Sequence, residues 1–170
     1  MVLNALGRRV TRKDMKGGHD TMAKTTISTE VQWAGLGVQS TARVRQHEIT
    51  IDEPVAWGGT DHGANPVELV LAGLGGCINV LLTSFAPLHQ VELSHVTINI
   101  EGDLDPEGFM GVNPAVRPGF SEIRYAIALE SHSPADRITA LVEHVERVCP
   151  VKDTLSGVEV MAQPLQIYAC

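Results

Sequence analysis

The chain has 170 residues, of which 44% are hydrophobic, and a formal net charge of −7. This length suits one domain of ordinary size with a core of its own. The charge is uneven, because residues 1–24 carry six basic and two acidic side chains whereas the remainder carries seven basic and eighteen acidic ones. An acidic body argues against nucleic acid as a partner, since phosphate contacts need clustered lysine and arginine. We therefore expect a small-molecule substrate.

The cysteine content and the N-terminus indicate the compartment. Three cysteines are too few for a secreted disulfide framework, and they form no CxxC motif. The N-terminus has no apolar core of the kind that a secretory signal needs. We expect a cytoplasmic protein, with residues 1–24 as a flexible tail rather than a functional arm, and residues 25–170 as a single domain.

The first half of the expected domain is a pair of strands followed by a loop. Residues 25–33 are rich in β-branched side chains and alternate loosely, and residues 42–51 alternate again, which predicts two strands. Residues 34–37 form a glycine-containing turn, so the two strands can make a hairpin. Residues 52–64 are rich in glycine and aspartate and are expected to be a loop.

A helix carrying a thiol follows this loop. Asn65 is a good N-cap, Pro66 fits the first helical position, and Glu68 completes a capping-box pattern. From residue 69 to residue 82 only Asn79 is polar, which predicts a central helix covered on nearly all sides. A membrane span is the rival interpretation, but the apolar run is about 14 residues and spanning needs about 20. We therefore expect no membrane segment.

Two further strands are expected after the helix. Pro87 should end the helix, and residues 91–100 alternate as a strand. Residues 102–119 are rich in glycine and proline and are expected to be a long loop. Residues 123–129 alternate again, so they should pair with the preceding strand across that loop.

The C-terminal part is expected to hold an amphipathic helix. Ser133 resembles a cap before Pro134, and apolar residues then recur at helical spacing up to residue 148. Pro150 should end this helix at Cys149 and begin a short one over residues 150–156. A last strand over residues 158–168 is interrupted by Pro164. The pattern as a whole favours an α+β fold with mainly antiparallel strands.

The thiols do not by themselves establish chemistry. Cys77 lies about 12 residues into its helix, too far from the N-terminus for the helix dipole to lower its pKa much. Its apolar neighbours should raise that pKa, and an inert core cysteine is the alternative to a reactive one. Cys149 could cap the short helix through its sulfur, or it could be structural only. Cys170 is terminal and is expected to be incidental.

Other site classes find no support in the sequence. No histidine has metal-ligand spacing with Cys77 or Cys149, so we expect no metal site. No nucleophile elbow, GxGxxG motif or Walker lysine is present, so we expect neither a hydrolase triad nor a nucleotide cofactor. The histidines considered are His47, His62, His89, His95, His132 and His144.

Two cysteine motifs carry a family resemblance. The run Asn65-Pro66-x-Glu68-Leu69 leads through residues 71–77 to Cys77, and Val148-Cys149-Pro150-Val151 follows some seventy residues later. This combination, over residues 25–168, resembles the OsmC/Ohr family of osmotically inducible and organic-hydroperoxide-resistance proteins. The resemblance implies a small α+β domain that forms an intertwined homodimer, with the sheet packed on the cysteine helix and a second helix, and with sites near the subunit interface.

The resemblance also implies thiol-dependent peroxidase chemistry in defence against oxidative stress. The cysteine matched by Cys77 attacks the peroxide as a thiolate and becomes a sulfenic acid, and the one matched by Cys149 condenses with it to a disulfide. A dithiol or lipoyl-type reductant would regenerate the enzyme, with no bound cofactor. An apolar pocket would favour an apolar organic hydroperoxide. The alternative is a family member without peroxidase activity that binds an apolar small molecule in the same interface pocket.

The chain departs from the family pattern at an acidic position. Peroxidases of the family carry a glutamate directly after the Asn-Pro pair, but here that position is Val67. The acid comes one residue later, at Glu68, which is about 100° further round the helix. Glu68 is therefore a supporting candidate whose carboxylate can point elsewhere.

A second departure concerns the cation that stabilises the thiolate. One branch of the family places an arginine in the glycine-rich loop, and that position corresponds to Trp57 in this chain. Arg43 or Arg45 on the second strand could substitute, with His47 and His62 as further candidates. Solvated surface side chains are the alternative interpretation for all four.

Overall fold

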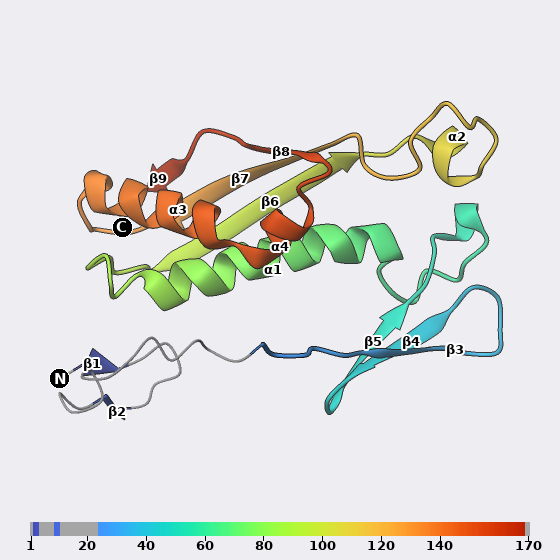
Figure 1. Cartoon of the computed structure of the whole chain (residues 1–170), viewed down its shortest axis with the longest axis horizontal. Coiled ribbons are helices and arrows are strands. Elements are labelled where there is room, and N and C mark those ends of the chain that lie inside the picture. Colours follow the sequence, from blue (N-terminus) through green and yellow to red (C-terminus); the bar gives the residue numbers. More distant parts are fainter. Residues whose placement is uncertain (1, 4–8, 11–23, 169–170) are drawn as a thin grey trace. The chain divides into compact units, whose positions relative to one another are not determined.

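The computed structural model describes residues 2–3, 9–10 and 24–168 (Figure 1). It divides into two compact units, Met1–Gly63 and Ala64–Cys170, and each is described here by itself. Strands β1 (Val2–Leu3) and β2 (Arg9–Val10) pair antiparallel. The rest of the predicted tail up to residue 23, and Cys170 with it, lies outside the described residues.

The N-terminal unit contains a three-stranded antiparallel sheet. Its strands are β3 (Glu30–Trp33), β4 (Ser40–Val44) and β5 (His47–Ile51), in that order. The predicted hairpin of the first two strands is confirmed. The prediction of one strand over residues 42–51 is wrong, because the chain reverses at Arg45, whose φ is 56°. No glycine, proline or asparagine marks this turn, so the alternating pattern ran through it unbroken.

The loop that follows is organised around a buried carboxylate. Asp52 is 1% exposed and accepts hydrogen bonds from the backbone N–H groups of Glu53, Thr60 and His62 and from the Thr60 hydroxyl. The Thr60 hydroxyl is the main reason that the pKa of Asp52 is held well below its usual value. Between Glu53 and Thr60 the chain forms a short 3-10 helix, η1 (Val55–Trp57).

The C-terminal unit contains a four-stranded mixed sheet. Strand β7 (Glu122–Glu130) pairs antiparallel with β6 (His95–Asp103), as predicted, and parallel with both β8 (Glu159–Ala162) and β9 (Gln166–Tyr168). Four of the six strand pairings in the described residues are antiparallel, which confirms the expectation of mainly antiparallel strands, while the two parallel pairings of β7 were not predicted. The helical segment between β7 and β8 is long enough to return the chain to the same end of the sheet, which a parallel connection requires. The interruption predicted at Pro164 separates β8 from β9.

Helices α1 (Pro66–Phe85) and α3 (Ala135–Val148) lie on one face of this sheet (Figure 1). The predicted capping box is confirmed, since Asn65 Oδ1 accepts from the Glu68 N–H at 2.8 Å and Glu68 Oε2 accepts from the Asn65 N–H at 2.8 Å. The short helix α4 (Pro150–Thr154) follows α3 directly, and its prediction is confirmed within two residues at its end.

Two local predictions in this unit are corrected. Residues 102–119 are not loop throughout, because β6 runs to Asp103 and Asp105 caps a four-residue helix, α2 (Pro106–Phe109). Ser133 does not cap α3, because its hydroxyl accepts from the Glu92 N–H at 2.8 Å and Pro134 occupies the N-cap position. Both corrections involve polar side chains that had more than one available partner.

The core of the C-terminal unit is built from one face of β7 and the two long helices. The buried side chains of α1 are those of Leu74, Ile78 and Leu82. The prediction that α1 is covered on nearly all sides is therefore wrong for the single chain, in which Val80 is 61% exposed. Composition indicates that a helix face is apolar, but it does not say whether the same chain covers it.

The length of helix α1 is relevant to the expectation that the chain has no membrane segment. It has 20 residues, several more than the apolar run counted in the sequence, because the capped first turn and the residues after Leu82 belong to it. Among the described residues it is the one helix that is long and apolar enough to cross a membrane by length and composition. A core helix of a soluble protein passes the same test, so this property alone does not assign it.

Candidate thiol site

The fold of the C-terminal unit brings Cys77 and Cys149 together. Their Sγ atoms are 3.3 Å apart, although the two residues are separated by 72 positions in the chain. Cys77 is half-buried on α1, and Cys149, which is 2% exposed, lies at the junction of α3 and α4. Both are free thiols in this structure. Two sulfurs at this separation need only a small approach to form a covalent bond.

Local sequence explains how Cys149 is held. Pro150 keeps Cys149 in an extended conformation, with φ −71° and ψ 110°, so α3 ends there and α4 begins at once. The sulfur then occupies the N-cap position of α4 and accepts from the Lys152 N–H at 3.5 Å, as the sequence suggested. The backbone N–H of Val151 faces Cys77. The first turn of α4 therefore directs one backbone N–H group toward each sulfur.

The surroundings of Cys77 do not favour its thiolate. Burial raises the pKa of the Cys77 thiol, the Val151 N–H opposes that shift, and the neighbouring Cys149 sulfur adds to it. The net direction is upward from the ordinary value, as the apolar helix predicted. A fast thiolate reaction at neutral pH would consequently need a cation beside Cys77.

A polar network that the sequence did not single out lies beside Cys149. Lys152 Nζ donates to the Tyr125 hydroxyl at 3.2 Å, and that hydroxyl donates to Glu146 Oε1 at 2.7 Å. Tyr125 is 1% exposed, and burial together with Glu146 raises its pKa well above the ordinary value. The available signals were a tyrosine on the apolar face of a strand and a lysine three residues after Cys149, neither of which is specific.

A polar cavity of about 310 Å³ adjoins this network. Cys149 and Lys152 both line it, together with side chains from the end of α3 and from the segment leading into β8. The other lining residues are Glu146, Arg147, Asp153, Ser156, Val158 and Val160.

The basic candidates for thiolate stabilisation belong to the N-terminal unit. Arg43 is exposed and bonds to Glu48 at 2.8 Å and to Gln32 at 2.9 Å. Arg45 lies in the turn between β4 and β5. A role for Arg43 or Arg45 beside Cys77 stays a prediction.

The N-terminal unit also holds the other residues considered as thiolate partners. His47 is the first residue of β5, and His62 Nδ1 lies 2.9 Å from Thr60 Oγ1. Trp57, at the position where a family branch carries arginine, ends the short helix η1 and is 52% exposed.

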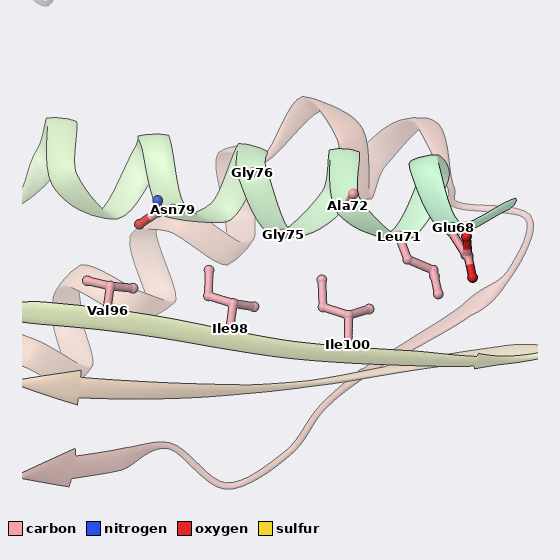
Figure 2. A pocket seen from close by; sticks show the side chains of 9 residues that line it. All are labelled: Glu68, Leu71, Ala72, Gly75, Gly76, Asn79, Val96, Ile98 and Ile100. Carbon is pink, nitrogen blue, oxygen red and sulfur yellow. The ribbon is translucent and has the colours of Figure 1, made fainter. Parts of the chain in front are cut away.

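A larger, mostly apolar cavity of about 480 Å³ lies between α1 and β6 (Figure 2). Gly75 and Asn79 line it, and each is two residues from Cys77, which corresponds to about 200° round a helix. The cavity and the thiol are thus on opposite faces of α1, whereas the sequence led us to expect the apolar pocket at the sulfur. The lining residues are Glu68, Leu71, Ala72, Gly75, Gly76, Asn79, Val96, Ile98 and Ile100.

Glu68, the supporting acidic candidate, lies on the cavity side. It precedes Cys77 by nine residues, which is about half a turn out of phase on a helix. Its carboxylate accepts from the Asn65 N–H and so serves the capping box. The structure therefore gives Glu68 a local structural task and does not bring it to the sulfurs.

The described residues contain no group of three or more histidine, cysteine, aspartate or glutamate side chains that could hold a metal ion. His89 and His144 form a pair, with His89 Nε2 and His144 Nδ1 2.9 Å apart. This pair joins the turn after α1 to α3, and Phe85 stacks on His144 with ring centroids 4.5 Å apart.

The chain is similar to a known protein family over more than half of its length. The family model described as OsmC-like protein matches residues 59–162, which include both cysteines of the site. No curated protein sequence matches the chain at a significant level.

Solved structures match over most of the chain. An OsmC-like protein from Mycoplasma pneumoniae has a TM-score of 0.71 at 19% identity, covering 86% of this chain and 99% of its own. An organic hydroperoxide resistance protein from Elizabethkingia anophelis has a TM-score of 0.62 at 18% identity, covering 88% and 99%. Another from Legionella pneumophila has a TM-score of 0.58 at 20% identity, covering 85% and 98%. At these identities the likeness establishes the fold.

Proposed function

The chain belongs to the OsmC-like protein family, and from this premise we propose that it reduces organic hydroperoxides by thiol chemistry. The observation that carries the proposal is the distance of 3.3 Å between Cys77 Sγ and Cys149 Sγ. A single-chain unit with two free thiols at that separation holds the two groups that a peroxide-reducing cycle needs.

The proposed cycle uses the two sulfurs in sequence. The Cys77 thiolate attacks the O–O bond, the alcohol leaves, and Cys77 becomes a sulfenic acid. The Cys149 thiol then attacks that sulfur, water leaves, and a disulfide forms. A dithiol or lipoyl-type reductant transfers two electrons to the disulfide and restores both thiols. No resident cofactor takes part.

The proposal includes a homodimer in the cytoplasm and a role in defence against oxidative stress. Support for the dimer comes from α1, whose face with Gly73, Gly76 and Val80 is exposed in the single chain. A second copy that covered this face would remove apolar surface from water. It would also supply surroundings that Cys77 lacks in one chain, including the cation that its raised pKa requires.

Variants of the two cysteines test the proposal. Consumption of cumene hydroperoxide with dithiothreitol as reductant should fall by at least about 100-fold in Cys77→Ser, because the thiolate is the nucleophile. Without dithiothreitol, Cys149→Ser should complete one turnover and stop at the sulfenic acid, which dimedone would trap. Undiminished consumption by Cys77→Ser would contradict the proposal.

A second candidate function rests on the cavity between α1 and β6. That cavity is mostly apolar, about 480 Å³ in volume, and it lies across the helix from Cys77. Its size is within the range of small-molecule sites. If the protein only binds an apolar small molecule in this cavity, Cys77→Ser should bind that molecule as tightly as wild type does. Under the same function, the wild-type protein should consume no hydroperoxide. Titration of both proteins with a fluorescent fatty acid, beside the peroxide assay, separates the two functions.

A further inference from the structure

Helix α4 determines the surroundings of both sulfurs, although it is very short. The Lys152 N–H donates to Cys149 Sγ at 3.5 Å, and the Val151 N–H faces Cys77. The helix spans five residues, Pro150–Thr154. An isolated helix of this length is not stable in water, since nucleation is unfavourable and few hydrogen bonds offset it. Contacts with the rest of the unit must therefore hold α4 where it is.

The side chain of Lys152 supplies a contact of this kind. Its Nζ donates to the Tyr125 hydroxyl at 3.2 Å and lies 5.5 Å from the centroid of the tyrosine ring. Tyr125 belongs to β7, the strand that pairs with the three other strands of the sheet, and it is 1% exposed. The hydroxyl is tied in turn to Glu146 of α3 at 2.7 Å. One lysine thus connects α4 to the sheet and to the preceding helix.

We propose that Lys152 is a positioning residue for the Cys77–Cys149 pair, acting through α4 and the Tyr125 hydroxyl. Disulfide formation requires the two sulfurs to approach from 3.3 Å to about 2.05 Å. The Lys152 side chain keeps Cys149 at this short range, so that its thiol meets the oxidised Cys77 sulfur quickly. In that step the Cys149 thiol loses its proton, the new S–S bond forms, and water leaves Cys77. This role rests on the proposed function, because the oxidised sulfur comes from the peroxide.

The charges of the network agree with this role. Lys152 is half-buried, and its ammonium group is linked through a neutral tyrosine hydroxyl to the Glu146 carboxylate. Loss of the ammonium group would leave the Tyr125–Glu146 bond intact but would remove the polar link from α4 to both, so that α4 would be held by the packing of Val151 and Leu155 against the core. Arg147 lines the same cavity and carries the same charge, yet it lies on α3 and does not tie α4 to the sheet.

The first test measures the disulfide equilibrium without any peroxide. In glutathione redox buffers, Lys152→Met should lower the equilibrium constant for the Cys77–Cys149 disulfide by about ten-fold, because residues in one network couple at this scale. Tyr125→Phe should have a similar effect, Lys152→Arg should restore most of the loss, and Arg147→Met should match wild type. Denaturant unfolding of each reduced protein measures its stability. It thereby distinguishes loss of the Lys152–Tyr125 contact from general unfolding.

The second test measures the step itself. After one equivalent of cumene hydroperoxide, Lys152→Met should accumulate about ten-fold more dimedone-trapped sulfenic acid per peroxide consumed than wild type, because the Cys149 thiol reaches the oxidised Cys77 sulfur more slowly. An unchanged redox equilibrium in both Lys152→Met and Tyr125→Phe would overturn the proposal. Absence of peroxide consumption in wild type would overturn the proposed function alone, because the redox equilibrium would still decide the role of Lys152.

Discussion

Two faces of α1 differ in their surroundings, since one borders a pair of thiols and the other borders an apolar cavity. One face carries Cys77 toward α3 and α4, where it meets a second thiol at 3.3 Å and a polar network behind it. The other face carries Leu71, Gly75 and Asn79 toward β6 and lines a cavity of about 480 Å³ with mostly apolar side chains (Figure 2). The buried side chains of Leu74 and Ile78 lie between the two.

The difference indicates that reactivity and apolar binding are separate properties of this helix in a single chain. A thiol site needs partner groups, and the partners of Cys77 come from the other end of the sequence. An apolar cavity needs only small residues and a neighbouring strand, which α1 and β6 provide between them. Substitutions on one face should therefore leave the property of the other face unchanged.

Truncation of a buried side chain between the two faces of α1 should have the largest effect on stability. Ile78 is fully buried, so Ile78→Ala should lower the free energy of unfolding by about 2–5 kcal/mol through lost burial and a remaining cavity. Urea unfolding followed by circular dichroism measures it. Val112→Ala is the control, because Val112 is 70% exposed. Val80 is 61% exposed in the single chain, so a loss in Val80→Ala well above that of the control would mean that another copy covers Val80.

Filling the cavity should act on one face only. A Cβ at Gly75 would lie 3.0 Å from Ile100 Cδ1, the flexible end of a side chain, so Gly75→Val can be accommodated while it occupies cavity space. Binding of a fluorescent fatty acid should weaken by about ten-fold, with Cys77 alkylation unchanged. Glu143→Val, at an exposed position of α3, is the control for a β-branched residue in a helix. Slower alkylation in Gly75→Val would show that the faces are coupled.

The pH dependence of Cys77 tests the thiol face. In the single chain, burial and the neighbouring Cys149 sulfur raise the pKa of Cys77, and the Val151 N–H opposes that shift. The midpoint of iodoacetamide alkylation should therefore lie above that of an unstructured cysteine in a monomeric form, and below it in a dimer that brings a cation to the sulfur. Cys149→Ala removes one of these causes and loosens the burial, so the midpoint should move down and alkylation at pH 7.5 should become a few-fold faster. A midpoint that moves up would contradict the assignment of causes.

The smallest effects are expected at the cap of α1. Asn65→Ala should destabilise the protein by about 1 kcal/mol, since it removes the acceptor for the Glu68 N–H. Glu68→Gln keeps an acceptor for the Asn65 N–H, so it should change stability by less than about 0.5 kcal/mol and leave Cys77 alkylation unchanged. A large loss of peroxide reactivity in Glu68→Gln would mean that this carboxylate serves the thiol after all.

Sequence reasoning succeeded where neighbouring residues decide the structure. Asn65, Pro66 and Glu68 predicted the start of α1, and Pro150 predicted that Cys149 would end one helix and cap the next. It failed at Ser133, where a distant backbone group competed for the side chain, and at Arg45, where no turn residue marks the reversal of the chain. Ser133 bonds to the Glu92 backbone instead of capping α3, and Arg45 reverses the chain inside an unbroken alternating pattern.

Some features of the candidate site could likewise be predicted from the sequence, and others could not. The two cysteine motifs could be read from the chain, and so could the apolar surroundings that raise the pKa of Cys77. The contact of Lys152 with Tyr125 could not be read, because 27 residues separate them and neither lies in a recognisable motif. The cavity across the helix from Cys77 was missed for a similar reason, as it depends on where β6 crosses α1.

The start of α1, the end of α3 at Cys149 and the two candidate thiols could be predicted from the chain, because they depend on residues a few positions apart. The meeting of Cys77 with Cys149, the contact of Lys152 with Tyr125 and the place of the apolar cavity on the opposite face of α1 could be seen only in the folded structure. Those outcomes depend on the packing of distant segments, and packing follows from the shapes and directions of elements that no local pattern encodes.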